Sequence, residues 1–114
     1  MKKITALALF KIHKGKLDEF KQLITAFIQA VKKNEPGIVF YEWYLNEESM
    51  ECMVLESYVD SDAVRSHAAN VGELLQKSLE ISDLKMETFG NPDAELKKMI
   101  QDMGAKNYPF FAGL

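Results

Sequence analysis

His67 is the side chain in this sequence best placed to move a proton. It follows Val64 by three residues and Ala63 by four, so on a helix it shares their apolar side and faces inward. An imidazole accepts or donates a proton near neutral pH, which suits general acid–base catalysis. The alternative is a core histidine bonded to a neighbour, because an unpaired buried polar group costs about 1–3 kcal/mol. The spacing makes His67 the candidate catalytic residue and leaves both interpretations open.

Glu56 is a carboxylate within an apolar strand pattern. It alternates with Cys52, Val54 and Tyr58, so all four side chains are expected on one face of a strand. If that face is buried, desolvation raises the pKa of Glu56 and makes it a plausible base lining a pocket. The alternative is a rim carboxylate paired with a lysine or arginine across strands.

Three aromatic residues could line a cavity near these groups. Tyr41 and Trp43 are two residues apart on one expected strand, and Tyr58 ends the next. Together with Glu56 they are the candidate substrate-binding residues. Ordinary core or dimer contacts are the competing interpretation, since aromatic residues at this period commonly pack. Cys52 has no partner base in the sequence pattern and is expected to be a small buried hydrophobe.

Several other site types are disfavoured. The sequence has no glycine-rich phosphate loop and no Cys-x-x-Cys, and its two histidines, His13 and His67, fall on different elements, so no metal site is expected. A net charge of -3 with 27% charged residues gives no basic field for nucleic acid or an anionic membrane.

The single cysteine rules out a disulfide framework within one chain and favours a location in the cytoplasm. The apolar start breaks at Lys11 without a cleavage site, so it is expected to be a strand rather than a signal peptide.

Hydrophobic periodicity predicts the elements that would position these residues. In chain order they are a strand over 3–12, a helix over 17–34, strands over 38–45 and 50–59, a helix that follows an acidic cap at 60–62 and that Gly72 separates from a short helix over 73–80, and a strand over 81–89. Pro36-Gly37 stops the long helix, and the polar turn at 46–49 joins two antiparallel strands. Asp60-Ser61-Asp62 is expected to cap the helix that carries His67.

The C-terminal part is expected to add one more helix and an aromatic tail. Asn91 is the predicted N-cap, with Pro92 at the first helical position. An apolar stripe follows and Gly104 ends the helix; the stripe is Leu96, Met99, Ile100 and Met103. We therefore divide the chain into a domain over 1–90 and a helix and tail over 91–114 that pack on the same domain.

The predicted order of elements is that of an α+β, ferredoxin-like fold, a split βαβ unit repeated twice. One face of its antiparallel sheet would pack against the helices. The strand over 38–45 is apolar on both faces, with Val39, Tyr41, Trp43 and Leu45 opposite Ile38, Phe40 and Tyr44. Because a bare apolar face needs a cover, we expect a homodimer.

Two segments resemble the antibiotic biosynthesis monooxygenase family. These are Glu35-Pro36-Gly37 with Tyr41 a few residues on, and the run from Val54 to His67 that contains Glu56, Tyr58, an acidic cap and Ala63. The similarity covers roughly residues 3 to 90. Tyr58 is a departure, because the family commonly has a tryptophan there.

The resemblance implies a dimeric α/β barrel with a cavity between each sheet and its helices. It also implies oxidation of a small hydroxylated aromatic or a quinol by molecular oxygen, with no metal or flavin cofactor. In that chemistry His67 would be the catalytic residue, and Tyr41, Trp43, Glu56 and Tyr58 would line the pocket. Haem degradation is not implied, because the positions that would need Asn, Trp and His hold Ala8, His67 and Lys77.

Two alternatives remain open on the same scaffold. One is a non-enzymatic protein that binds a small molecule or serves in a stress response. The other is an isomerase or lyase, which would turn over without oxygen.

Overall fold

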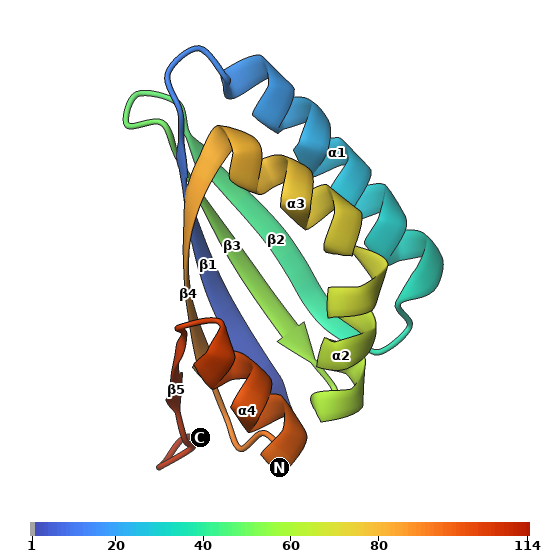
Figure 1. Cartoon of the computed structure of the whole chain (residues 1–114). Coiled ribbons are helices and arrows are strands. Elements are labelled where there is room, and N and C mark those ends of the chain that lie inside the picture. The colour runs from blue at the N-terminus through green and yellow to red at the C-terminus, as the bar shows by residue number, and fades with distance from the viewer. Residues whose placement is uncertain (1) are drawn as a thin grey trace.

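The computed structural model describes residues 2–114 and contains one mixed sheet with four helices (Figure 1). The elements are β1 (Ile4–Ile12), α1 (Leu17–Asn34), β2 (Ile38–Asn46), β3 (Glu51–Tyr58), α2 (Ser61–Asn70), α3 (Gly72–Ile81), β4 (Ser82–Phe89), α4 (Ala94–Asp102) and β5 (Lys106–Tyr108). The ferredoxin-like α+β prediction is confirmed. None of the helices within residues 2–114 is long and apolar enough to cross a membrane.

The sheet has the strand order β2-β3-β1-β4-β5. The first four strands are antiparallel neighbours, and β5 pairs with β4 in parallel. Its register places Glu56 opposite both Ala6 on β1 and Tyr41 on β2. Because side chains alternate along a strand, these three residues share the face that carries the helices.

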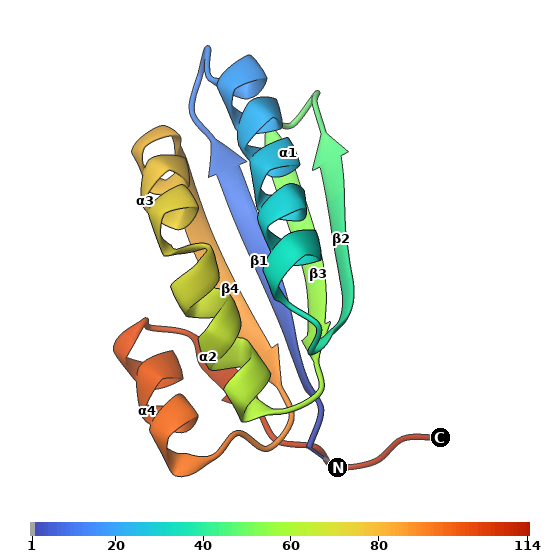
Figure 2. The same cartoon turned by 90° about the vertical axis from the view of Figure 1, so that its right-hand side faces the viewer.

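All four helices lie on one face of the sheet (Figures 1 and 2). α1 and α3 cover the end near the β2–β3 hairpin, whereas α2 and α4 lie toward the opposite end, where the chain begins. The helix-facing residues of β1 follow the strict alternation of a half-buried strand, and they are Ile4, Ala6, Ala8, Phe10 and Ile12.

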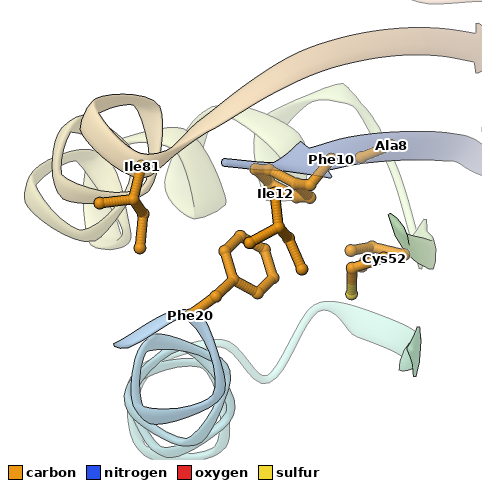
Figure 3. Close-up of a cluster of buried hydrophobic side chains, with 7 residues drawn as sticks. Ala8, Phe10, Ile12, Phe20, Cys52 and Ile81 are labelled. Atoms are coloured by element: carbon orange, nitrogen blue, oxygen red, sulfur yellow. The ribbon is translucent and has the colours of Figure 1, made fainter. Parts of the chain in front are cut away.

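Large side chains fill the hairpin end of this interface (Figure 3). We call this group the closed cluster; it comprises Ala8, Phe10, Ile12, Phe20, Cys52, Val54 and Ile81. Phe20 of α1 is fully buried and meets Phe10 edge to face, with ring centroids 5.3 Å apart. Cys52 is buried as expected, and burial raises the pKa of its thiol to about 11.

A β-bulge in β2 corrects the predicted division of that strand. The register with β3 shifts between Ile38 and Phe40. Ile38 therefore packs on the helix side with Tyr41 and Trp43, while Val39 is 53% exposed. Simple alternation had placed Val39 with Tyr41, which is wrong because a bulge adds one unpaired residue and reverses the faces beyond it.

The C-terminal helix begins later than predicted. The N-cap of α4 is Asp93, whose carboxylate accepts a hydrogen bond from the Leu96 backbone N–H at 2.9 Å. Asn91 does not cap the helix; its side-chain oxygen instead accepts a hydrogen bond from the backbone N–H of Phe110. Pro92 consequently lies before the helix rather than at its first position.

A short strand, β5, was not predicted at all. Its central residue, Asn107, accepts a hydrogen bond from Thr88 at 2.7 Å and donates one to the Gly90 carbonyl. Tyr108 stacks on Phe89 with ring centroids 5.5 Å apart. Beyond β5 the tail is exposed, and Phe111 is 98% accessible to solvent. The sequence did not predict β5 because a strand of three residues is too short to show a hydrophobic period.

Candidate active site

His67 lies on α2 with its imidazole buried between two carboxyl groups. Its Nδ1 is 2.9 Å and 3.0 Å from the two carboxyl oxygens of Glu35. Its Nε2 is 3.7 Å from Oε1 of Glu56, beyond hydrogen-bonding distance. Because a carboxylate can only accept a hydrogen bond, Nδ1 carries the proton and Nε2 is left toward Glu56. This is the arrangement in which one carboxylate orients a histidine for proton transfer at its other nitrogen.

Glu35 is held in place by an asparagine on the same helix as His67. The Asn70 amide donates hydrogen bonds to Oε2 of Glu35 at 2.8 Å and to the Ala30 carbonyl at 3.0 Å. Asn34 in turn donates to the Asn70 side-chain oxygen at 3.0 Å. The end of α1 and the end of α2 are therefore joined through the group that orients His67.

Glu56 projects from β3 on the other side of the imidazole. The Tyr58 hydroxyl donates a hydrogen bond to Oε1 of Glu56 at 2.5 Å. Both residues are buried, and Tyr58 is only 1% exposed. Desolvation raises the pKa of Glu56, an effect that the nearby His67 partly offsets. Burial and the adjacent Glu56 likewise raise the pKa of Tyr58 and of Tyr41, so both phenols stay protonated.

These groups border a cavity of about 110 Å³ between the sheet and the helices α2 and α4. The cavity lies over Ala6 and Ala8 of β1. Their small side chains leave space there, whereas the larger Ile4 and Phe10 lie on either side of them along the strand. Aliphatic and sulfur-containing side chains form most of the remaining wall, including Val64, Leu84, Met86, Leu96, Met99 and Ile100. The volume is of the order that holds one aromatic ring, since an apolar cavity of about 150 Å³ binds benzene.

The structure brings all five candidate residues to one cavity. Tyr41 and Tyr58 lie with their ring centroids 5.4 Å and 5.2 Å from that of His67, and Glu56 is adjacent. Trp43 also borders the cavity, but its indole stacks on Phe10 at 5.8 Å and so belongs equally to the packing of the closed cluster. Its indole nitrogen is buried and forms no hydrogen bond within residues 2–114.

Two residues of this site were missed in the sequence. Glu35 stands before Pro36-Gly37 and was named only as the first residue of a segment that resembles the family, because no pattern shows that a turn carboxylate is buried. Asn70 follows His67 by three residues, and that spacing places both side chains on one face of a helix, so Asn70 could have been identified from the sequence.

Within residues 2–114, no three His, Cys, Asp or Glu side chains are arranged to hold a metal ion.

The fold and the site together define an α+β ferredoxin-like protein with an acid–base cluster beside an apolar cavity. The sequence profile of the antibiotic biosynthesis monooxygenase family matches residues 3–72, and the chain belongs to that family. No curated protein sequence matches the chain.

Solved structures of similar fold include three that differ in how much of the chain they cover. MupZ from Pseudomonas fluorescens is 24% identical with a TM-score of 0.86, and the match covers 100% of this chain and 94% of MupZ. SnoaB from Streptomyces nogalater, described as a cofactor-independent oxygenase, is 16% identical with a TM-score of 0.68 over 82% of this chain and 97% of its own. A putative antibiotic biosynthesis monooxygenase from Bacteriodes thetaiotaomicron is 21% identical with a TM-score of 0.68, covering 75% and 85%.

Proposed function

We propose that this protein is a cofactor-independent monooxygenase that oxidises a small hydroxylated aromatic or a quinol with molecular oxygen. The observation that carries the proposal is the pairing of His67 with Glu35 at the wall of an apolar cavity. Family membership and the fold shared with SnoaB, a cofactor-independent oxygenase, support the same chemistry. His67 is the catalytic base, and Tyr41, Trp43, Glu56 and Tyr58 surround the ring of the substrate.

The reaction needs no group beyond the substrate and oxygen. Nε2 of His67 takes the phenolic proton, and Glu35 stabilises the imidazolium through Nδ1. The electron-rich phenolate reduces oxygen, and the oxygen then bonds to a ring carbon as a peroxide. Loss of water from that peroxide leaves a carbonyl, and the proton on His67 departs with the water. Phenol and oxygen thus become a quinone and water, with the ring supplying the electrons.

The cavity favours this sequence of steps because its lining is almost entirely apolar. Its lining within the described residues contains no lysine or arginine, and most of it is aliphatic. A dry, apolar site strengthens the interaction between the phenolate and the imidazolium and keeps the peroxide from being hydrolysed. We therefore expect neutral one-ring phenols to be better substrates than phenols that carry a carboxylate.

Oxygen uptake on a panel of one-ring quinols and phenols tests the proposal. His67→Ala should lower uptake about 100-fold to 10,000-fold, the usual contribution of a positioned general base. Ala8→Leu should abolish uptake by filling the cavity while leaving His67 and Glu35 in place. Phe111→Ala is the control, because Phe111 is 98% exposed and borders neither the cavity nor the apolar face of the sheet. Uptake that is unchanged in both site variants contradicts the proposal, as does a panel on which nothing turns over.

We also propose that the working form is a homodimer that closes the α/β barrel. The face of the sheet away from the helices carries an apolar group, Leu7, Leu9, Phe40, Tyr44, Met53 and Leu55. Phe40 and Tyr44 are 37% and 54% exposed in the single chain. A second copy would cover these residues symmetrically, which is the common solution for such a face. Sedimentation at micromolar concentration tests this, and a monomer contradicts it.

A further inference from the structure

Glu56 stands opposite His67 with one carboxyl oxygen already in use. Its Oε1 accepts the hydrogen bond from Tyr58, whereas Oε2 accepts none within residues 2–114. The side chain is only 8% exposed, and the exposed part belongs to a residue that borders the cavity. A proton held on Oε2 would therefore be available to a molecule inside the cavity.

The charges around the cavity leave this carboxyl without a counter-charge of its own. Two carboxyl groups, Glu35 and Glu56, flank one imidazole, and the lining holds no lysine or arginine among the described residues. Both carboxyl oxygens of Glu35 lie within 3.0 Å of Nδ1 of His67, whereas Oε1 of Glu56 lies 3.7 Å from Nε2. Burial raises the pKa of Glu56, an effect that the nearby His67 and the hydrogen bond from Tyr58 partly offset. Titratable neighbours in such different environments commonly divide into an acid and a base.

We propose that the same site catalyses an oxygen-independent reaction, the enolisation and double-bond isomerisation of small neutral ketones, with Glu56 as the general acid and His67 as the base. The proposal rests on the proposed role of His67 and adds a second catalytic residue to it. Nε2 of His67 lies 3.7 Å from Oε1 of Glu56, so the base and the acid border the same part of the cavity, within reach of a molecule whose acidic carbon and carbonyl oxygen are two bonds apart.

The proton movements balance without any added oxidant or cofactor. With a β,γ-unsaturated ketone, Nε2 of His67 takes the proton from the α-carbon while Oε2 of Glu56 gives its proton to the carbonyl oxygen. The product of this step is a neutral dienol beside an imidazolium and a carboxylate. His67 then returns its proton to the γ-carbon, and Glu56 recovers the proton from the enol oxygen. The net result is the conjugated ketone with both side chains restored.

The conversion of 3-cyclohexen-1-one to 2-cyclohexen-1-one under nitrogen tests this activity, because the ketone has one ring and only the product absorbs strongly in the near ultraviolet. The full chain should accelerate the reaction at least about 100-fold over buffer, the lower end of the usual contribution of a positioned acid or base. Glu56→Gln keeps the size of the side chain and an acceptor for Tyr58 but cannot donate the acid proton, so it should lower the rate 10-fold to 1,000-fold. Glu56→Asp should recover part of the loss.

The two activities are separated by measuring oxygen uptake on phenols with the same samples. Because Glu56 also borders the bound ring, Glu56→Gln is expected to raise the KM for phenols; a loss of isomerisation that lies in kcat and exceeds the loss of phenol oxidation supports Glu56 as the acid of this second reaction. A Glu56→Gln protein that folds, by circular dichroism, and isomerises like the wild type overturns the assignment. Absence of isomerisation by a protein that still oxidises phenols overturns this inference alone, whereas loss of both reactions contradicts the proposed function as well.

Discussion

The two ends of the helix-covered face use one strand pattern for opposite purposes. On β3, Cys52 and Val54 contribute to the closed cluster, while Glu56 and Tyr58 of the same face border the cavity. Phe20 from α1 and Ile81 from α3 fill the first end (Figure 3), whereas the small Ala6 leaves the second end hollow. An inward-facing side chain thus adds to the stability of the fold only where neighbouring side chains fill the space around it.

The polar end has a thermodynamic disadvantage that the closed cluster does not share. Burying carboxyl groups costs free energy that hydrogen bonds offset only in part, and a single imidazole serves both Glu35 and Glu56. The closed cluster gains free energy from every methylene that it removes from water. We therefore expect substitutions at the two ends to differ in sign or in size.

The largest effect is expected in the closed cluster. Phe20→Ala should lower the free energy of unfolding by about 3–5 kcal/mol, because a fully buried ring leaves a cavity that the sheet cannot close. Urea unfolding followed by circular dichroism measures this. Phe111→Ala is the control, since that side chain is 98% exposed and should change stability by less than about 0.5 kcal/mol. A loss below about 1 kcal/mol for Phe20→Ala would show that the two ends do not differ.

A smaller effect is expected where a partly buried hydrogen bond positions the site. Asn70→Ala removes the donor to Oε2 of Glu35 and should cost about 1–3 kcal/mol of stability. It should also lower turnover, because Glu35 then holds His67 less firmly. Asn34→Ala removes only the exposed contact to Asn70 and is the matched control. Equal losses in both variants would mean that the amide network, rather than the buried carboxyl, carries the effect.

Glu56→Gln should reveal the cost of the polar end through its pH dependence. Burial raises the pKa of Glu56 above its ordinary value of 4.5, so the folded protein keeps a proton that the unfolded chain releases. Wild-type stability should therefore fall as pH rises above about 4.5, by about 1.4 kcal/mol for each unit by which the pKa is raised. The variant lacks this slope, so its stability relative to wild type should rise between pH 4 and pH 7. Parallel stability curves for the two proteins would be inconsistent with a raised pKa.

The smallest effect concerns the attachment of α4 to α2 at the surface. The Arg65 guanidinium and the Leu96 backbone N–H lower the pKa of Asp93 from 3.8 to about 2. Asp93→Asn keeps an N-cap but loses the pairing with Arg65 at 2.8 Å, and should lower the melting temperature at pH 7 by about 2–4 °C. A lowered pKa stabilises the fold above pH 4 and loses its contribution as pH falls toward 2, so wild type and variant should melt alike at pH 2. A difference that persists at pH 2 would have to come from the cap rather than the charge.

The sequence by itself determined the elements and the residues that face inward. Periodicity located α1, the paired strands β2 and β3, and the divided helix that carries His67, because alternating and helical patterns are properties of consecutive residues. The same patterns placed Glu56, Tyr58 and His67 on the inner side of their elements. Local reasoning failed at Val39 and at Asn91, where one bulge and one competing cap, Asp93, outweighed it.

Only the tertiary structure decided that these inward residues form a site. The partnership of Glu35 with His67 joins residues 32 positions apart, and it arises because the end of α1 packs beside α2. The cavity likewise depends on two alanines of β1 that lie opposite the β3 residues in register. Such contacts are set by strand register and helix packing between distant segments, and a single sequence carries no local signal for either of them.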